Sequence, residues 1–326
     1  MSRDIEMKDD TQHEYHYNGI PTFMRSPYIK IDELENINVA VVGVPVDQNV
    51  SYRNGQRFGP RAIREATFWD SINGQEYWDF GEEAFIQSND LVIGDLGDVV
   101  VYPGDSERTN KSIISTLDSI RSKAFPITLG GDHSITYGAF IGCNRALKDK
   151  YSSIGLLHFD AHPDIEEEYR TLARIHHGNV IGSLIREGYL DGHNVVTIGL
   201  RGHEPKEWTE FSKNEGMKRY SMMDIHRKTL SAILDESIQY LQKKCDGVYL
   251  TFDIDCIDPS QAPGTGTPEF GGIKVEEFFL CMKQLKRLPL IGFDLVEVSP
   301  PLDTSGITVV AACEILWHFL SFGFSS

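Results

Sequence analysis

Residues 156–164 of the chain read LLHFDAHPD, an apolar run typical of a buried β-strand that ends in an acid, a histidine and an acid at every second position. In an extended backbone, alternate side chains face the same side of the strand. Asp160, His162 and Asp164 can therefore all point in one direction. Two carboxylates and an imidazole that converge where a strand leaves its sheet form half of a metal site.

The other half of such a site follows two further apolar runs. Asp253 and Asp255 form a D-x-D pair at the end of one run, and His133 lies in the Gly-rich sequence GGDHS at the end of another. Four carboxylates within a few ångströms would repel one another unless cations lay between them. Two ions that share bridging carboxylates suit six ligands better than one ion does. Carboxylate-rich ligation without thiolate favours Mn²⁺ over structural zinc.

Apolar, β-branched segments that read as strands alternate with helical patterns along the chain. The predicted strands are residues 38–46, 91–94, 125–129, 154–159, 194–200, 217–220, 247–252 and 289–295. This alternation is typical of a parallel sheet with helices on its faces. Polar residues gather after the carboxyl ends of strands, where open α/β sheets and TIM barrels both place their sites, and periodicity alone does not separate these two architectures.

The helices are predicted from apolar periodicity and capping residues. Asp105 or Ser106 caps one of them. The predicted ranges are 60–67, 106–122, 134–147, 179–186, 222–243, 275–286 and 307–320. The Gly-rich loop at 51–60 either lines a site or forms the turn into the helix that Pro60 opens.

The composition limits the classes of protein to which the chain can belong. The chain has 326 residues, a formal net charge of -17 and five cysteines without a CxxC pair. The acidic balance argues against binding to nucleic acid or to anionic membranes. Because we find no signal peptide and no apolar run of about 18 residues, we expect a cytoplasmic protein. Residues 1–19 lack apolar periodicity and are expected to form a poorly ordered arm, with one domain over 20–326.

Three motifs together carry a resemblance to a known family. GGDHS (130–134), DAHPD (160–164) and DIDCIDP (253–259) resemble the signatures of the arginase and agmatinase family, the ureohydrolases. The similarity extends from about Gly19 to the last predicted helix. It implies a three-layer α/β/α sandwich around an eight-stranded, mostly parallel sheet. It also implies a binuclear Mn²⁺ enzyme that hydrolyses a guanidino group to urea and an amine, and that assembles as a homotrimer or homohexamer.

The resemblance also implies a ligand set. One ion would take His133, Asp160, Asp164 and Asp253, and the other Asp160, His162, Asp253 and Asp255. Asp160 and Asp253 would bridge the two ions. A hydroxide held between two cations is a strong nucleophile near neutral pH, and Asp164 could orient it through a hydrogen bond.

Two further residues match functional positions of the family. Glu297, after the strand at 289–295, resembles the glutamate that pairs with the guanidinium group, whose N–H groups a carboxylate accepts with matching geometry. His177, which precedes Gly178, resembles the histidine that shuttles protons, and an imidazole suits protonation of a leaving amine. The neighbouring His176 is the other candidate for that role.

The substrate is left open within the family. Residues 19–25, 57–60 and 297–301 resemble the agmatinase branch, so agmatine, cleaved to putrescine and urea, is the expected substrate. Glu166, Glu167 and Glu168 could receive its distal ammonium, or could form a solvated face. Guanidine hydrolases, guanidinobutyrases and guanidinopropionases, some of them nickel-dependent, are the alternatives. A deacetylase-like amide hydrolase, which would use His176 and His177 as a tandem pair, is the alternative from another class.

Overall fold

The computed structural model describes residues 19–67, 76–79, 84–87, 91–167 and 173–324. Its centre is an eight-stranded sheet in which every paired strand runs parallel to its neighbour. In spatial order the strands are β4 (Ile93–Asp98), β1 (Val39–Val44), β5 (Phe125–Gly130), β10 (Leu290–Val296), β9 (Gly247–Asp253), β6 (Ile154–Phe159), β7 (Val195–Leu200) and β8 (Lys218–Ser221). The sheet is open, since β4 and β8 form its two edges. The predicted α/β class is confirmed, and the sheet does not close into a TIM barrel.

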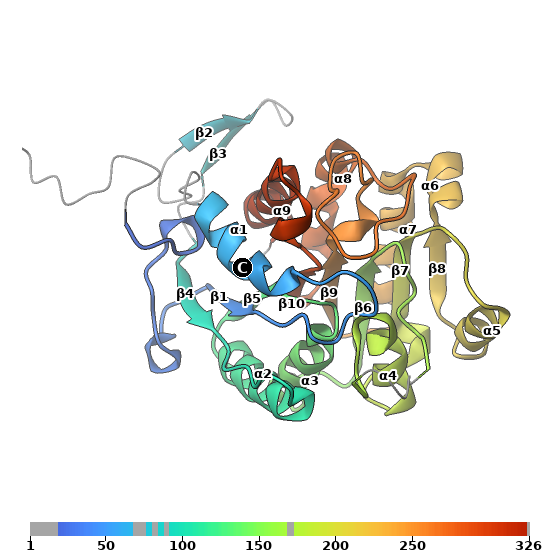
Figure 1. The fold of residues 1–326 in the computed structure, drawn as a ribbon, viewed down its shortest axis with the longest axis horizontal. Helices are drawn as coiled ribbons and strands as arrows, with labels where there is room; N and C mark the ends of the chain where they lie inside the picture. Colours follow the sequence, from blue (N-terminus) through green and yellow to red (C-terminus); the bar gives the residue numbers. More distant parts are fainter. Residues whose placement is uncertain (1–18, 68–75, 80–83, 88–90, 168–172, 325–326) are drawn as a thin grey trace, which may run out of the picture.

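Helices cover both faces of the sheet and make three layers (Figure 1). One layer contains α1 (Gly59–Thr67), α6 (Met222–Lys228), α7 (Leu230–Gln242), α8 (Val275–Met282) and α9 (Ile307–His318). The other contains α2 (Ser106–Arg121), α3 (Ile135–Leu147), α4 (Val180–Arg186) and α5 (Lys206–Asn214). Strand side chains alternate between the layers, as Val41 and Val42 do, because consecutive side chains point to opposite faces.

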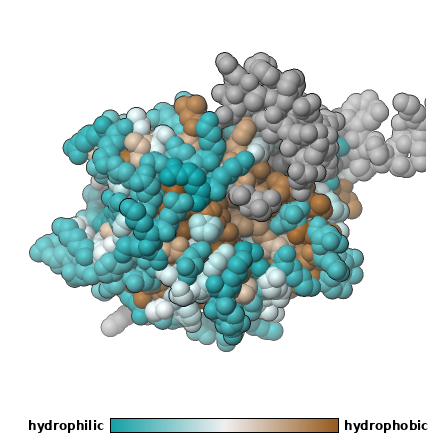
Figure 2. Space-filling view, turned by 180° about the vertical axis from the view of Figure 1, so that it is seen from behind, coloured by the Kyte–Doolittle hydropathy of each residue, from teal (hydrophilic) through white to brown (hydrophobic). Residues whose placement is uncertain are grey.

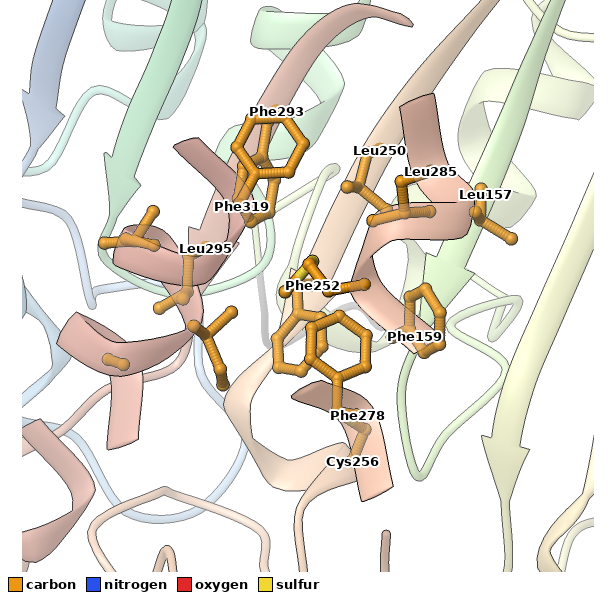
Figure 3. Packing of buried hydrophobic residues seen from close by; sticks show 14 of the residues in the cluster. Leu157, Phe159, Leu250, Phe252, Cys256, Phe278, Leu285, Phe293, Leu295 and Phe319 are labelled. Atoms are coloured by element: carbon orange, nitrogen blue, oxygen red, sulfur yellow. The ribbon is translucent and has the colours of Figure 1, made fainter. Parts of the chain in front are cut away.

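Aromatic side chains fill the first of these layers. Phe278 of α8 packs against Phe159 of β6 and Phe252 of β9, with ring centroids 5.2 and 4.8 Å apart (Figure 3). Phe293 and Phe319 form a second pair at 4.6 Å. Each buried phenylalanine contributes roughly 1.5–3 kcal/mol relative to an exposed one. This packing fixes β6 and β9, the strands that carry the acidic motifs.

The prediction of one long helix over 222–243 is wrong, because the structure has two helices there. Thr229 separates α6 from α7 with φ 108°, a backbone conformation that a helix cannot contain, and its hydroxyl caps α7 by accepting from the N–H of Ala232. Helix α5 and the antiparallel hairpin of β2 (Glu76–Asp79) and β3 (Ala84–Gln87) were not predicted. The predicted arm at 1–19 lies outside the described residues except for its last position.

The side seen in Figure 2 is mostly hydrophilic, and apolar side chains gather near its middle. Across the described residues, none of the helices combines the length and the apolar character that a membrane span requires.

The order of the strands brings the sequence motifs together. β5, β10, β9 and β6 are neighbours at the centre of the sheet, and GGDHS, Glu297, D-x-D and DAHPD follow them in that order. Phe159 pairs with Phe252, and Leu129 pairs with Leu295. The polar residues therefore leave the same edge of the sheet side by side.

Candidate active site

The first group of candidate ligands surrounds His133. Its Nδ1 lies 3.0 Å from Asp164 Oδ2, 3.1 Å from Asp160 Oδ2 and 3.2 Å from Asp253 Oδ2. All four side chains are buried. Three strand ends, those of β5, β6 and β9, thus contribute to one cluster.

The second group surrounds His162. Its Nδ1 lies 3.4 Å from Asp160 Oδ1 and 3.1 Å from Asp255 Oδ2. Asp160 therefore faces His133 with Oδ2 and His162 with Oδ1, an arrangement that suits a bridging ligand. Asp253 faces His133 with Oδ2, while its Oδ1 accepts the backbone N–H of Asp255 at 2.8 Å. All six predicted metal ligands are brought together at this edge of the sheet.

The donor set around His133 fits a cation. Among the described residues, the buried Nδ1 has no hydrogen-bond partner of acceptable geometry, although three carboxylate oxygens surround it. The other ring nitrogen, Nε2, lies 2.9 Å from Thr251 Oγ1. Histidine ligands of metal sites use one nitrogen for the ion and the other for a protein partner in this way.

The electrostatics of the cluster also favour added positive charge. Burial, followed by the charges of Asp255 and Asp160, raises the pKa of Asp253 well above its usual value. Burial lowers the pKa of His162, but Asp255 and Asp160 outweigh it and raise the pKa to about 12. For Asp160, burial opposes ionisation, yet the neighbouring histidines, His158 first, lower its pKa well below the usual value. Asp253 and His162 thus favour their protonated forms, and divalent cations would supply positive charge in place of these protons.

His177 and Glu297 lie beside the cluster. Glu297 Oε1 accepts the backbone N–H of His133 at 2.8 Å and lies 3.6 Å from His177 Nδ1. Burial lowers the pKa of His177, but Glu297 and then Asp164 raise it to about 9. His176 is fully buried, and its backbone N–H donates to Asn179 Oδ1. Of the two adjacent histidines, His177 is the one that lines the pocket.

Two of the acids have a strained backbone. Asp164 and Glu297 have φ angles of 50° and 66°, in the left-handed region that residues other than glycine rarely adopt. Such conformations persist only where the surrounding structure imposes them, and they gather at functional sites. The backbone thus aims both carboxylates toward the cluster at a cost in local energy.

A pocket of about 210 Å³ opens above the cluster. His162, Asp164 and Asp253 form part of its wall. Its other lining residues include Ser51, Glu166, His177, His203, Trp208 and Thr267. Of the acidic loop expected to face the substrate, Glu166 lines the pocket, Glu167 is exposed, and Glu168 lies outside the described residues.

Three residues near the site were missed in the sequence. His158 Nε2 lies 2.8 Å from Asp160 Oδ2, and the same alternation that selected Asp160 could have selected it. Ser51 contacts His177, and Gln56 contacts Glu297. Both belong to the Gly-rich loop at 51–60, so this loop does line the site in addition to leading into α1.

Comparisons with known proteins agree with this geometry. A family model described as the arginase family matches residues 37–321. The chain is 37% identical to a guanidinobutyrase of Pseudomonas aeruginosa, covering 93% of this chain and 92% of that protein. It is 35% identical to an agmatinase of Chromobacterium violaceum, covering 93% and 88%. The solved structure of proclavaminate amidinohydrolase from Streptomyces clavuligerus has a TM-score of 0.81 at 31% identity, covering 95% of this chain and 98% of that one.

Proposed function

This chain belongs to the arginase family and is a ureohydrolase, and from that premise we propose that it hydrolyses agmatine to putrescine and urea. The observation that carries the choice of agmatine is the charge of the pocket. Its lining includes Glu166, a carboxylate outside the six proposed metal ligands, and no Lys or Arg is among the described residues that line it. An acidic side chain at the wall, in addition to the carboxylates that would hold the ions, suits a substrate with a cationic tail such as agmatine.

The guanidinium end would bind Glu297. Its Oε1 already accepts from the N–H of His133, and its Oε2 accepts from Gln56 Nε2 at 2.8 Å. Each carboxylate oxygen has a further lone pair, so Glu297 can still accept two N–H groups of a planar guanidinium. The buried position of Glu297 strengthens this ion pair, since water screens it little.

Two divalent ions, Mn²⁺ in our proposal with Ni²⁺ as the alternative, would be held by the six clustered side chains. His133, Asp160, Asp164 and Asp253 would hold one ion, and Asp160, His162, Asp253 and Asp255 the other. When bound, such a pair supplies an activated water for attack on the guanidinium carbon.

Two residues of the chain would then act on the reaction. The Asp164 carboxylate would accept a hydrogen bond from the attacking water and orient it. His177 would give a proton to the nitrogen of the leaving amine, a task that suits an imidazole placed next to Glu297. This assignment makes His177, Asp164 and Glu297 the catalytic residues.

The amine end would bind Glu166. The backbone of this residue is fixed, because its N–H donates to Gly178 O at 3.0 Å and its carbonyl accepts from Arg186 Nη1 at 2.8 Å. Arg186 Nη2 also donates to the carbonyl of Ile165. A carboxylate on an anchored backbone at the pocket wall is a better receptor for an ammonium than a mobile surface acid.

A guanidino acid is the second candidate substrate, since a guanidinobutyrase and a guanidino acid hydrolase are among the relatives of the chain. A deacetylase-like reaction is not supported. The chain belongs to the arginase family, and of the tandem pair His176 and His177 only His177 lines the pocket. We also propose that the enzyme is cytoplasmic and assembles as a homotrimer or homohexamer.

A substrate panel tests the proposal. Metal-depleted protein would be reloaded with Mn²⁺ or Ni²⁺, and urea release would be measured from agmatine, arginine, 4-guanidinobutyrate, 3-guanidinopropionate and guanidine. We expect agmatine with Mn²⁺ to give the highest kcat/KM. A preference for a guanidino acid or for guanidine would keep the family chemistry and overturn the proposed substrate.

A further inference from the structure

Arg201 is the first residue after β7, the strand that lies beside β6 in the sheet. Its side chain reaches past the end of β6 to the 3₁₀ turn Ile254–Cys256, which follows β9. This turn contains Asp255, one of the proposed ligands of the second ion. Because a guanidinium is a cation and cannot be a metal ligand, any effect of Arg201 on the ions must pass through the backbone that it contacts.

Backbone carbonyls surround the guanidinium of Arg201. Its N–H groups donate to five of them, those of Gly199, Asp255, Cys256, Ile257 and Glu269. Nη1 lies 3.1 Å from the oxygen of Gly199 and 3.2 Å from that of Cys256. Nη2 contacts the carbonyls on either side of Cys256 in the sequence. Every nitrogen of the side chain is therefore used to hold backbone.

Three of these carbonyls belong to consecutive residues, 255–257. Carbonyls that converge on one place repel one another, because the negative ends of their dipoles meet there. The end of a helical turn also leaves carbonyls without partners inside the turn. A guanidinium supplies a permanent positive charge and five donors in one plane, whereas a lysine supplies three donors on a single nitrogen. Arginine is thus the side chain that fits this set of acceptors.

The backbone of Arg201 holds the other acidic motif. Its N–H donates to the carbonyl of Ala161 at 3.1 Å, and the N–H of Ala161 donates to Asp255 Oδ1 at 3.1 Å. Ala161 directly precedes His162, whose Nδ1 lies 3.1 Å from Asp255 Oδ2. Arg201 therefore binds the carbonyl of Asp255 with its side chain and, through Ala161, the carboxylate of the same residue.

The first ligand group is held by other contacts. The N–H of His133 donates to Glu297, and its Nε2 lies against Thr251 Oγ1. Asp253, which belongs to both ligand groups, is the last residue of β9 and pairs with Val296 of β10. A change at Arg201 should therefore disturb Asp255 and leave the ligands around His133 in place.

We propose that Arg201 is a positioning residue for the second metal ion. Its guanidinium gathers the carbonyls of the turn and holds the Asp255 carboxylate opposite the His162 ring. The second ion then does not have to order the turn when it binds, which favours its affinity. This inference rests on the two-ion site of the proposed function.

One conservative variant tests this role. Arg201→Lys keeps the charge and removes the planar set of donors. We expect the affinity for the second Mn²⁺ to fall by roughly ten- to a hundredfold, the range typical when a partner that orients a metal ligand is lost. The affinity for the first Mn²⁺ should stay close to that of wild type. Arg219, also half-buried and paired with Glu204, supplies the matched control Arg219→Lys.

Two measurements on metal-depleted, full-length protein give the result without an activity assay. Calorimetric titration with Mn²⁺ gives the two affinities. EPR spectra at two equivalents of Mn²⁺ separate a pair of neighbouring ions, which are exchange-coupled, from isolated ions. We expect the coupled spectrum in wild type and in Arg219→Lys, and its loss in Arg201→Lys.

A second ion bound as tightly in Arg201→Lys as in the control, or equal weakening of both ions, would overturn the inference. So would loss of folded protein both in Arg201→Lys and in Arg201→Gln, because Arg201 would then serve the fold as a whole. If wild type took up only one ion, the two-ion proposal would fail and this inference with it. If wild type bound two ions and released no urea, the proposed activity would fail, while the titration would still decide the role of Arg201.

Discussion

The Glu166 carboxylate lies directly over Gly178, so that a Cβ at position 178 would come within 2.9 Å of Glu166 Cδ. The glycine next to the proposed proton donor thus makes room for the proposed receptor of the amine. This contact links the two halves of the substrate site and explains why a small residue follows His177.

Removing the charge of Glu166 should weaken binding of substrates with a cationic tail. For Glu166→Gln we expect kcat/KM for agmatine to fall by roughly ten- to a hundredfold, since one charged hydrogen bond contributes roughly 1.5–3 kcal/mol. Hydrolysis of guanidine, which has no tail, should not change if it is detectable. Glu167→Gln, at the exposed neighbour, is the control. An unchanged or higher kcat/KM for agmatine would remove Glu166 from the binding site.

Filling the space at Gly178 should have a related effect. Gly178→Ala would push the Glu166 side chain aside, because the nearest atoms to the added methyl group are those of its carboxylate. We expect KM for agmatine to rise, and kcat/KM to fall by less than it does for Glu166→Gln. The melting temperature should remain nearly unchanged. Steady-state kinetics and thermal unfolding measure the two quantities. A variant with normal KM would show that the contact has no role in binding.

Asp253 should be required for both ions. Asp253→Asn removes a buried charge 3.2 Å from His133 Nδ1, and we expect urea release to fall by roughly a hundredfold or more and metal content to fall below two ions per chain. Metal analysis of the purified protein measures the second effect. The exposed Asp235 provides the control Asp235→Asn. Two retained ions with normal turnover would contradict the binuclear assignment.

The start of α9 should lose stability in acid. Asp303 accepts the hydroxyl of Ser305 at 2.6 Å and the backbone N–H groups of Thr308 and Ser305. Although burial opposes ionisation, these hydrogen bonds, that of the Ser305 hydroxyl first, lower its pKa from 3.8 to about 2. The folded state therefore binds this proton less tightly than the unfolded state. The stabilisation is complete above pH 3.8 and is lost as the pH falls through 2.

We expect Asp303→Asn to lower the free energy of unfolding by about 2 kcal/mol at pH 7, and the difference from wild type to shrink between pH 4 and 2. Chemical unfolding of the metal-free proteins at several pH values measures this difference. Glu65→Gln, which breaks an exposed ion pair with Arg61, should change stability far less. A difference that stays constant with pH would contradict the role of Asp303.

Much of the fold was predictable because local signals and tertiary structure agree. The strand at 154–159 has the predicted bounds, and Asp105, one of the two predicted caps, caps α2. The break at Thr229 was not predictable, since the residues on either side continue one helical pattern and only the tertiary structure imposes φ 108°. Helix α5 was missed because its buried residues are few and its sequence is highly polar.

The site was predictable where ligand chemistry is repeated at fixed spacing. The acid, histidine and acid after an apolar run identified Asp160, His162 and Asp164, and the D-x-D pair followed from the same pattern. The extended backbone assumed for both motifs is wrong, because β6 ends at Phe159, Asp164 has φ 50° and Asp255 lies in the 3₁₀ turn Ile254–Cys256. Ser51 and Gln56 carried no such pattern. They contact His177 and Glu297 across more than a hundred residues of the chain, and these contacts follow from the order of the strands, which local sequence does not encode.

The most direct test of the binuclear hydrolase is a titration of metal-depleted protein with Mn²⁺ while urea release from agmatine is followed. We expect activity to rise and reach its plateau at two ions per chain, since Asp160 faces His133 and His162 with its two oxygens. A plateau at one ion, or no urea at any ratio, would contradict the account.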